Sequence, residues 1–407
     1  GSDVSIEELR NMFDAIILCY GADGERKLGL KGEDTLQGVE SAREFVNWYN
    51  GFPIDPMTSN SAEKKPLPHS NNKWFQQSTK KYINMLHTAK RVVIIGQGNV
   101  AVDVARLIAK PTSELRKYDT TEFALEALNE NSVELVQLIG RRGPVQAACT
   151  TNELRELTKI EGASLYFNPE ELKLNELETA DLEKAGRPKR RLLEVMQANT
   201  TVATSQRCVI EFKFLRNPVE FLGDDQGKLR AVRFEKTKLV GTPGNLSAVS
   251  TGEFEDVECN VAFRSIGYKS HALPGIPFDN AKGIVPNMAG KVVESNAVKE
   301  TVKGLYVCGW LKRGPTGVIL SNIVDAQETV QSIMEDLLGG KIAGAGSGSI
   351  LGGAEALSSL LGSKRVNFVT FEQYKKIEKY EVSKGKEMGK IREKLVNIED
   401  MLNVANQ

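Results

Sequence analysis

The stretch RVVIIGQGNVAVDVARLIAK, residues 91–110, decides the fold that we expect for this chain. Its apolar run at 92–95 is typical of a buried parallel strand. Gly96, Gln97 and Gly98 then predict a tight turn, and from Asn99 onward apolar residues recur at helical spacing. A strand, a glycine turn and a helix start can cradle a phosphate, because the first helical turn offers free N–H groups and the positive end of the helix dipole.

The third glycine of the usual dinucleotide-binding pattern is replaced here by Ala101, which still permits close packing of helix on strand. Taken alone, the pattern fits two interpretations. One is a dinucleotide-binding turn, and the other is an ordinary strand–helix turn of an α/β core.

The next predicted strand, residues 132–139, ends in a pair of arginines, Arg141 and Arg142. NAD-binding folds place an acidic residue near this strand end to hold the ribose 2′-hydroxyl, whereas NADP binders place arginine there for the 2′-phosphate. A guanidinium matches phosphate geometry and stays charged. The arginines therefore favour NADP over NAD, and the alternative is a basic surface loop.

Length and composition limit the function classes. At 407 residues, 41% hydrophobic and 26% charged, the chain is long enough for two or three globular domains. Lys+Arg and Asp+Glu both number 53, which gives no overall field toward nucleic acid or membrane. The five cysteines are scattered without a CxxC pair, and the three histidines lie outside every motif. This disfavours a metal site, a disulfide framework and histidine-based hydrolysis.

Other segments show weaker patterns. The aromatic residues Phe45, Trp48 and Tyr49 have helical spacing and are interpreted as core. The phrases AIILCYGA (15–22) and NVAFRSIGY (260–268) resemble each other and suggest two nucleotide-binding folds. We expect helices at 5–13, 41–53, 74–88, 113–130, 150–158 and in the tail 366–405, an exposed loop at 54–72, appended antiparallel strands within 207–263, and a flexible linker at 344–353.

A second glycine-rich stretch runs from 304 to 337, GLYVCGWLKRGPTGVILSNIVDAQETVQSIMEDL. It predicts a strand, a loop and a long helix that starts near Gly317, where backbone N–H groups could meet an anionic or polar cofactor edge. Flavoproteins carry an aspartate after the corresponding glycine, and here Trp310 replaces it. A basic cluster, GRPKRRL at 186–192, is either a solvated face or a docking site for an acidic partner.

Four phrases together are far more specific than a glycine turn. GQGNVAVDVAR, IGRRGPVQAACTTNELREL, SIGYKS and GWLKRGPTGVI, in this order and spacing, resemble the adrenodoxin reductase family nearly end to end. The resemblance breaks mainly at the insertion 54–90 and at the Gly/Ser tract. It implies an α/β fold with two Rossmann-like domains, whose parallel sheets have helices on both faces, and a small antiparallel sheet. The NADP domain (26–274) would be inserted into an FAD domain (1–25 and 275–407).

The resemblance also implies roles for individual residues. The pyrophosphate of NADP would meet Gln97, Gly98, Asn99 and Val100. Arg141 and Arg142 would hold its 2′-phosphate, with Glu153 at the same nucleotide end. The flavin would be lined by Trp310, Gly317, Val318 and Ile319, with Gly317 also near the nicotinamide. Asp103 is a candidate for steering protons. The basic face for an acidic 2Fe–2S ferredoxin would comprise Arg155, Arg187, Lys189, Arg190 and Arg191.

The implied activity is that of a mitochondrial flavoprotein reductase, at most peripherally associated with a membrane. NADPH would reduce FAD, which would reduce a ferredoxin that serves steroid hydroxylation or the synthesis of iron–sulfur clusters and haem. The family begins with a strand and a GxGxxG turn for FAD, and this sequence does not contain them. We therefore expect a truncated FAD domain.

Two alternative hypotheses follow. The chain could be a flavin-free NADPH-binding or ferredoxin-docking fragment without catalysis. It could also resemble the reductase-like subunits of glutamate synthase, which carry cysteine-rich segments that we do not find in this sequence.

Overall fold

The computed structural model describes residues 3–53, 73–202, 206–295, 297–342 and 352–407. The predicted loop 54–72 and nearly all of the predicted linker 344–353 lie outside the described residues. The contacts divide the chain into two compact units, each built from two separate segments. Unit 1 comprises Gly1–Arg26 and Gly267–Phe368, and unit 2 comprises Lys27–Ile266 and Val369–Gln407.

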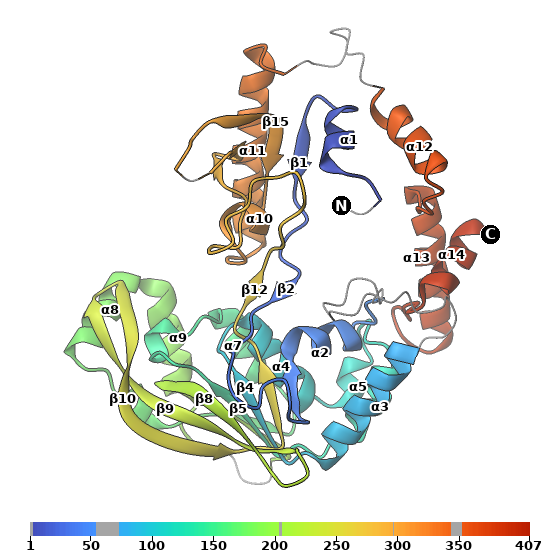
Figure 1. The fold of residues 1–407 in the computed structure, drawn as a ribbon. Helices are drawn as coiled ribbons and strands as arrows, with labels where there is room; N and C mark the ends of the chain where they lie inside the picture. Colours follow the sequence, from blue (N-terminus) through green and yellow to red (C-terminus); the bar gives the residue numbers. More distant parts are fainter. Residues whose placement is uncertain (1–2, 54–72, 203–205, 296, 343–351) are drawn as a thin grey trace. The chain divides into compact units, whose positions relative to one another are not determined.

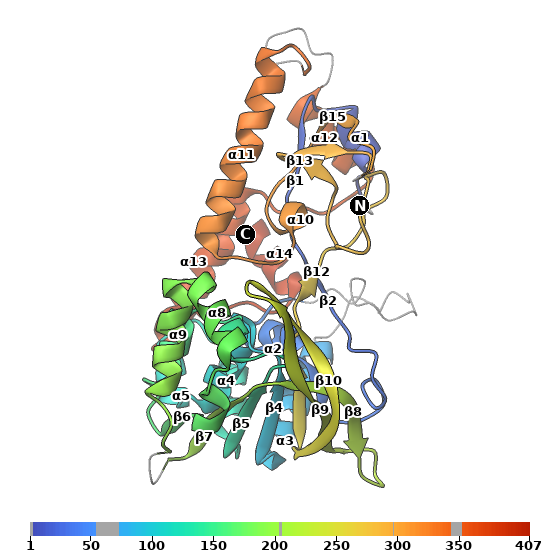
Figure 2. The ribbon, with the colours of Figure 1, turned by 90° about the vertical axis from the view of Figure 1, so that its left-hand side faces the viewer.

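A six-stranded sheet forms the centre of unit 2 (Figures 1 and 2). Its spatial order is β3-β11-β4-β5-β7-β6, and every pair is parallel. The strands are β3 (Val39–Ser41), β4 (Arg91–Ile95), β5 (Leu135–Ile139), β6 (Ala163–Phe167), β7 (Cys208–Lys213) and β11 (Val261–Arg264). Because the strands are parallel, the turns that follow β4, β5 and β7 all lie at one edge of the sheet.

Helices cover one face of this sheet, although we predict helices on both faces, because the antiparallel sheet covers the other face. They are α2 (Ala42–Tyr49), α3 (Lys73–Thr88), α4 (Asn99–Ala109), α5 (Thr112–Leu115), α6 (Glu122–Asn129), α7 (Thr151–Leu157), α8 (Glu176–Ala185) and α9 (Arg187–Gln197), with short turns η1 (Pro144–Gln146) and η2 (Pro169–Leu172). Phe45 and Trp48 of α2 are fully buried in the core beneath these helices, and Tyr49 packs against it, which confirms their interpretation as core.

The helix predicted at 113–130 is wrong as a single element. Two helices, α5 and α6, occupy this region. Thr121 between them has an extended backbone, and its hydroxyl donates to the carbonyl of Tyr49 at 3.1 Å. That contact with α2 interrupts the helical path.

The second face of the parallel sheet packs against an antiparallel sheet of β8 (Arg216–Gly223), β9 (Leu229–Thr242) and β10 (Asn245–Glu258), in the order β10-β9-β8. The prediction of antiparallel strands throughout 207–263 is therefore right for these three strands and wrong for β7 and β11, which join the parallel sheet. Burial alternates along β7, so its sequence has the pattern of an antiparallel strand.

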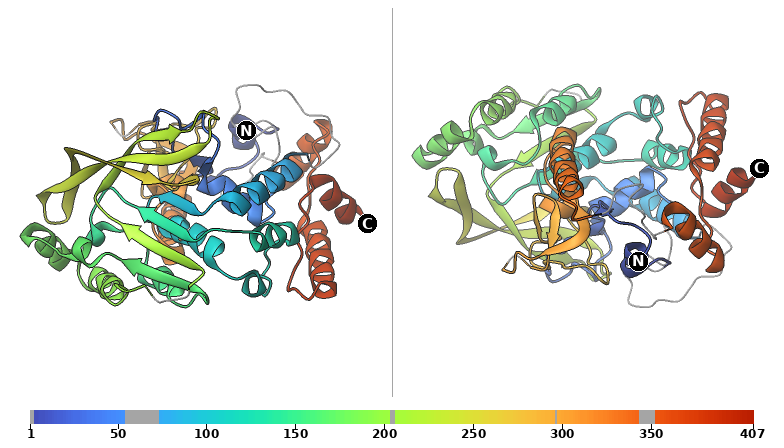
Figure 3. Two further views of the ribbon diagram at one scale, coloured as in Figure 1. Left: turned by 90° about the horizontal axis from the view of Figure 1, so that it is seen from below. Right: turned by 90° about the horizontal axis from the view of Figure 1, so that it is seen from above.

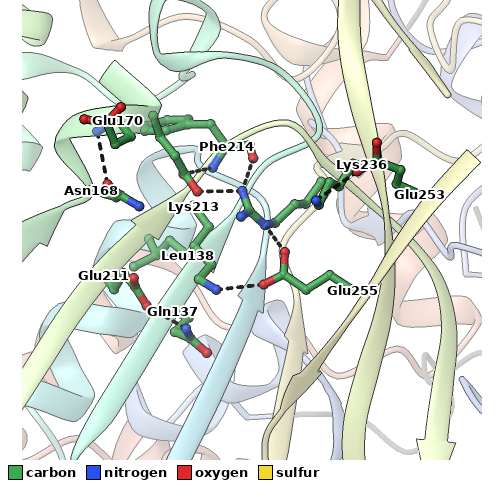
Figure 4. A network of polar contacts seen from close by, with 12 residues as sticks. Gln137, Leu138, Asn168, Glu170, Glu211, Lys213, Phe214, Lys236, Glu253 and Glu255 are labelled. Atoms are coloured by element: carbon green, nitrogen blue, oxygen red, sulfur yellow. Dashed lines mark hydrogen bonds and ion pairs between the residues drawn. The ribbon is translucent and has the colours of Figure 1, made fainter. Parts of the chain in front are cut away.

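Ion pairs connect the two sheets of unit 2. Glu255 of β10 accepts from Lys213 at the end of β7 (3.1 Å) and from Arg216 at the start of β8 (2.7 Å), as Figure 4 shows for Lys213 and Glu255. Arg216 also pairs with Glu171 of η2 at 2.7 Å. All four side chains are more than two-thirds buried. The network fixes the antiparallel sheet near the edge where the parallel strands end.

Unit 1 contains a four-stranded sheet in the order β1-β15-β14-β13. Its strands are β1 (Ile16–Leu18), β13 (Asn287–Met288), β14 (Lys291–Val293) and β15 (Thr301–Val307), and a further pair joins β2 (Gly24–Glu25) to β12 (Tyr268–Lys269). Its helices are α1 (Ile6–Arg10), α10 (Trp310–Arg313), α11 (Ile319–Leu338) and α12 (Gly353–Ser363). Helix α11 buries polar residues, Asp325, Thr329, Ser332 and Asp336, while Ile319 and Leu320 are exposed.

The C-terminal tail belongs to unit 2. Its helices α13 (Phe371–Glu387) and α14 (Ile398–Asn406) pack against each other (Figure 3). After α13, the carboxylate of Glu393 accepts from the N–H of Glu122 at 3.1 Å, and buried Lys390 pairs with Glu393. The tail is therefore separate from residues 267–368, although we predict both as parts of the FAD domain. No helix within the described ranges is long and apolar enough to span a bilayer.

Candidate functional site

The turn between β4 and α4 is open above the helix N-terminus. Gly96 has φ +125°, and a Cβ there would lie 2.2 Å from the carbonyl oxygen of Ser265, so only glycine fits at this position. Gly98 is the N-cap of α4 and no side chain caps this helix end. A Cβ at Gly98 would meet nothing within 4 Å. The N-terminus of α4 is thus uncapped beside open space at Gly98, as an anion site requires.

The residues around Gly98 fix this turn. The side-chain amide of buried Gln97 donates to the carbonyls of Leu138 (3.2 Å) and Lys213 (2.8 Å). Its side chain therefore supports the strand ends, and its main-chain N–H is the group left for a pyrophosphate. The side-chain oxygen of Asn99 accepts from the N–H of Thr150 at 2.9 Å and links the starts of α4 and α7, while Val100 is half-buried.

Arg141 and Arg142 follow β5 and are both exposed. Their main chain is fixed, because the carbonyl of Arg141 accepts from the hydroxyl of Thr237 (2.7 Å) and that of Arg142 accepts from the N–H of Leu215 (3.1 Å). In the described part of the chain, neither guanidinium forms an ion pair. Two uncompensated positive charges on a fixed backbone, at the sheet edge that carries the glycine turn, suit a phosphate group.

Asp103 and Glu153 lie together, and Arg106 joins them. The guanidinium of Arg106 pairs with Asp103 on the same helix and with Glu153 of α7 at 3.5 Å. Burial raises the pKa of Asp103, Arg106 lowers it and Glu153 raises it further. Sequence reasoning missed Arg106, although its position one helical turn after Asp103 was the available signal.

Three of the predicted docking residues surround one surface pocket. Arg155 of α7 and Arg187 and Arg191 of α9 line a pocket of about 200 Å³, together with Thr151, Asn152 and Pro188. These arginines and Arg190 are exposed and form no ion pair with any residue that the structure describes. Lys189 is different, because its ammonium donates to the carbonyl of Ala147, and burial together with nearby Arg142 lowers its pKa.

The predicted flavin residues lie in unit 1. Trp310 is half-buried and stacks on Tyr268 with 6.1 Å between ring centroids. Its indole N–H is buried and has no hydrogen-bond partner among the described residues. Just before it, Gly309 has φ +72°, and a Cβ there would meet nothing within 4 Å. A buried indole donor without a partner requires an explanation, and a ligand bound beside the open backbone at Gly309 would supply the missing acceptor.

The start of α11 completes this region. Gly317 has φ +86°, and Val318 and Ile319 are 50% and 80% exposed. Sequence reasoning missed Lys312, which is buried and pairs with Asp325 (2.9 Å) and Glu328 (2.6 Å) of α11. Asp325 also accepts from the N–H of Gly309. Lys312 and Asp325 therefore hold Gly309 and the short helix α10, which carries Trp310, against α11.

Comparison with known proteins places the chain among electron-transfer enzymes. The chain is 41% identical over 416 residues to the mitochondrial NADPH:adrenodoxin oxidoreductase of Arabidopsis thaliana, covering 100% of this chain and 80% of that protein. It is 37% identical over 414 residues to the human enzyme of the same name, covering 99% of this chain and 76% of that protein.

A solved structure agrees with these relatives, whereas no family model matches the chain. Mycobacterium tuberculosis FprA in complex with NADPH has a TM-score of 0.82 and 31% identity, and the match covers 100% of this chain and 81% of that one.

Proposed function

Because this chain belongs to the NADPH:adrenodoxin oxidoreductase family, we propose that it transfers electrons from NADPH through FAD to an acidic 2Fe–2S ferredoxin. As a member of this family, the chain is an oxidoreductase that uses NADP and FAD. The observation that carries the proposal is the uncapped N-terminus of α4, open at Gly98, on the same sheet edge as the uncompensated Arg141 and Arg142. The names of the mitochondrial relatives support a mitochondrial location for this chain. The reduced ferredoxin that we propose would serve steroid hydroxylation or the synthesis of iron–sulfur clusters and haem.

The NADP contacts that we propose use groups that form no hydrogen bond or ion pair with the residues that the structure describes. Main-chain N–H groups from Gln97 to Val100 bind the pyrophosphate, and Arg141 and Arg142 bind the 2′-phosphate. Glu153 would lie at the same nucleotide end, where Arg106 fixes its carboxylate. Asp103, whose pKa burial raises, would hold or release a proton beside this site.

The residues of unit 1 fit a flavin. The indole N–H of Trp310 would donate to a polar edge of the ring system, which would satisfy its buried nitrogen. The main-chain N–H groups of Gly317 and Ile319 would face the same group, while the N–H of Val318 donates to the hydroxyl of Ser321 at 3.3 Å. The exposed side chains of Val318 and Ile319 would exclude water from it. When bound, the nicotinamide and the flavin supply the hydride and electron-transfer chemistry, and the protein supplies position and electrostatics.

Four arginines carry the proposed ferredoxin surface: Arg155, Arg187, Arg190 and Arg191. Uncompensated surface charge of one sign steers an oppositely charged partner and raises its association rate. Lys189 supports this surface from below rather than contacting the partner, because its ammonium is held by the carbonyl of Ala147.

The docking surface is tested by replacing Arg155, Arg187 and Arg191 together with alanine. We expect kcat/KM for a 2Fe–2S ferredoxin to fall about tenfold at low salt and the salt dependence to weaken. NADPH oxidation with ferricyanide, a small acceptor, should stay unchanged. Lys173→Ala is the matched control, because Lys173 is exposed but already paired with Glu170 at 2.6 Å. Equal losses with ferredoxin and ferricyanide would contradict the docking role.

A further inference from the structure

Two cysteines follow neighbouring strands in unit 1. Leu18, the last residue of β1, is the register partner of Val307, the last residue of β15, and the strands are parallel. The N–H of Cys308 donates to the carbonyl of Leu18 at 3.0 Å, which holds Cys308 against β1 one residue past the end of β15. Cys19 and Cys308 are also close enough for the charge of one thiol to raise the pKa of the other. Cys19 therefore lies directly beside Cys308, and register partners in neighbouring strands project from the same face.

The spacing of these strands suits a covalent bond between the two thiols. Neighbouring strands lie about 4.7–4.9 Å apart, within the Cα separations of about 4.4–6.8 Å that disulfides bridge. Both cysteines are free thiols; Cys19 is exposed and Cys308 is half-buried. A reagent can thus reach one member of the pair directly.

The remaining three cysteines differ from this pair. Cys149, Cys208 and Cys259 are all buried. Burial raises the pKa of the Cys149 and Cys208 thiols to about 11 and that of Cys259 to about 12. Because the thiolate is the reactive form, these three are inert near neutral pH.

We propose that Cys19 and Cys308 are an oxidation-sensitive thiol pair, which a peroxide converts into an intramolecular disulfide. In the first step the Cys19 sulfur attacks the peroxide oxygen, the O–O bond breaks, and sulfenic acid and water form. In the second step the Cys308 sulfur attacks the Cys19 sulfur, which releases its hydroxyl with the Cys308 proton as water. In total, the two thiols are oxidised by two electrons and hydrogen peroxide is reduced to two waters.

The environment of each thiol sets this order. Burial and a hydrogen bond to the carboxylate of Asp325 raise the pKa of the Cys308 thiol. The exposed Cys19 therefore meets the oxidant first, and Cys308 beside it is the resolving partner, whose raised pKa makes the second step the slower one.

The bond would connect β1 to β15 immediately before the turn at Gly309 and Trp310. This inference uses only the sheet of unit 1 and holds whether or not the proposed electron-transfer function does. The disulfide would tie the turn at Gly309 and Trp310 to both strands. Oxidation would therefore reduce the mobility of this turn, and reduction would restore it.

Tryptic mapping of the purified chain tests the pair. Trypsin releases Cys19 in the peptide 11–26 and Cys308 in the peptide 304–312, each with a single cysteine. After hydrogen peroxide treatment at low protein concentration, we expect these two peptides to appear joined under non-reducing conditions and separate after thiol reduction. Cys259→Ala, which removes a buried thiol elsewhere, should leave the cross-link unchanged.

Two single variants separate the steps. Cys19→Ser should abolish the cross-link and leave Cys308 as a thiol, whereas Cys308→Ser should leave a Cys19 sulfenic acid that dimedone traps. The proposal is overturned if the wild-type chain gives dimedone-labelled Cys19 without the joined peptides. It is also overturned if Cys19 forms only disulfides between chains, whose yield rises with protein concentration, or if peroxide leaves Cys19 unmodified.

Discussion

Gly96 and Gly98 lie in one turn, but the space available for a side chain differs between the two positions. Gly96 has φ +125° and has no room for a Cβ, because the carbonyl of Ser265 would lie 2.2 Å away. Gly98 has φ −88° and unfilled space above it. The fold therefore requires the first glycine but not the second, which we assign to pyrophosphate binding.

We predict that Gly98→Ser keeps the fold and weakens NADPH binding by at least about tenfold. A serine at the N-cap accepts a hydrogen bond from the N–H groups that we assign to the pyrophosphate, so it competes with the ligand while it stabilises the helix. Thermal unfolding should show an unchanged or raised Tm, and titration with NADPH should show the loss.

Gly96→Ala is the contrasting variant. It should lower the free energy of unfolding by about 2 kcal/mol or more, because an alanine there is strained and clashes with backbone. If the Gly98→Ser protein binds NADPH normally, the N-terminus of α4 does not bind the pyrophosphate.

Arg141→Ala and Arg142→Ala should each weaken NADPH binding about tenfold and leave NADH binding nearly unchanged. A lost charge-assisted hydrogen bond costs roughly 1.5–3 kcal/mol, and 1.4 kcal/mol is tenfold in affinity. Dissociation constants for both nucleotides check this. Arg230→Ala, an exposed arginine on β9, is the control. A parallel loss of NADH affinity would argue against a 2′-phosphate contact.

Sequence reasoning proposes site residues from local patterns and does not predict side-chain contacts with distant partners. The glycine turn and the arginine pair can be recognised from their immediate neighbours. The side chain of Gln97 instead reaches the carbonyl of Lys213, 116 positions away, and Lys189 reaches that of Ala147, 42 positions away. Such partners become visible only when the sheet edge has been assembled.

The connection between the two sheets of unit 2 depends on Glu255. Burial alone would raise the pKa of this carboxyl, but hydrogen bonds from Arg216 and Lys213 outweigh it, so the pKa is lowered from 4.5. A lowered pKa in the folded state contributes stability that is present above pH 4.5. That contribution is lost as pH falls through the folded-state value.

Glu255→Gln should therefore reduce the free energy of unfolding by about 1 kcal/mol at neutral pH and by less in acid, where the wild-type contribution also disappears. Urea unfolding across the acid range measures this. Glu253→Gln on the same strand is the matched control, because Glu253 pairs with Lys236 at an exposed site. A loss of equal size at all pH values would contradict the assigned titration.

Elements were easier to predict than their pairing. The sequence pattern locates β4 and α4 well, because buried strands and amphipathic helices are visible in local periodicity. It does not distinguish parallel from antiparallel pairing for β7, where burial alternates. Nor does it show that Thr121 leaves the helical path to contact α2, since that contact spans 72 positions.

The division of the whole chain into two discontinuous units was only partly predictable. The similar phrases at 15–22 and 260–268 indicate two folds, but no local pattern assigns the tail at 369–407 to unit 2. Its position depends on contacts such as that between Glu393 and the N–H of Glu122, 271 positions apart. Which cofactor each unit binds stays a prediction.

One experiment tests the central claim, that electrons pass from NADPH to FAD on this chain. The visible absorption spectrum of the purified protein is recorded after incubation with FAD and removal of the excess, and again after anaerobic addition of NADPH. We expect flavin absorption bands whose intensity corresponds to about one FAD per chain, and we expect these bands to bleach when NADPH is added. A colourless protein that still binds NADPH would contradict the account and identify a flavin-free nucleotide-binding fragment.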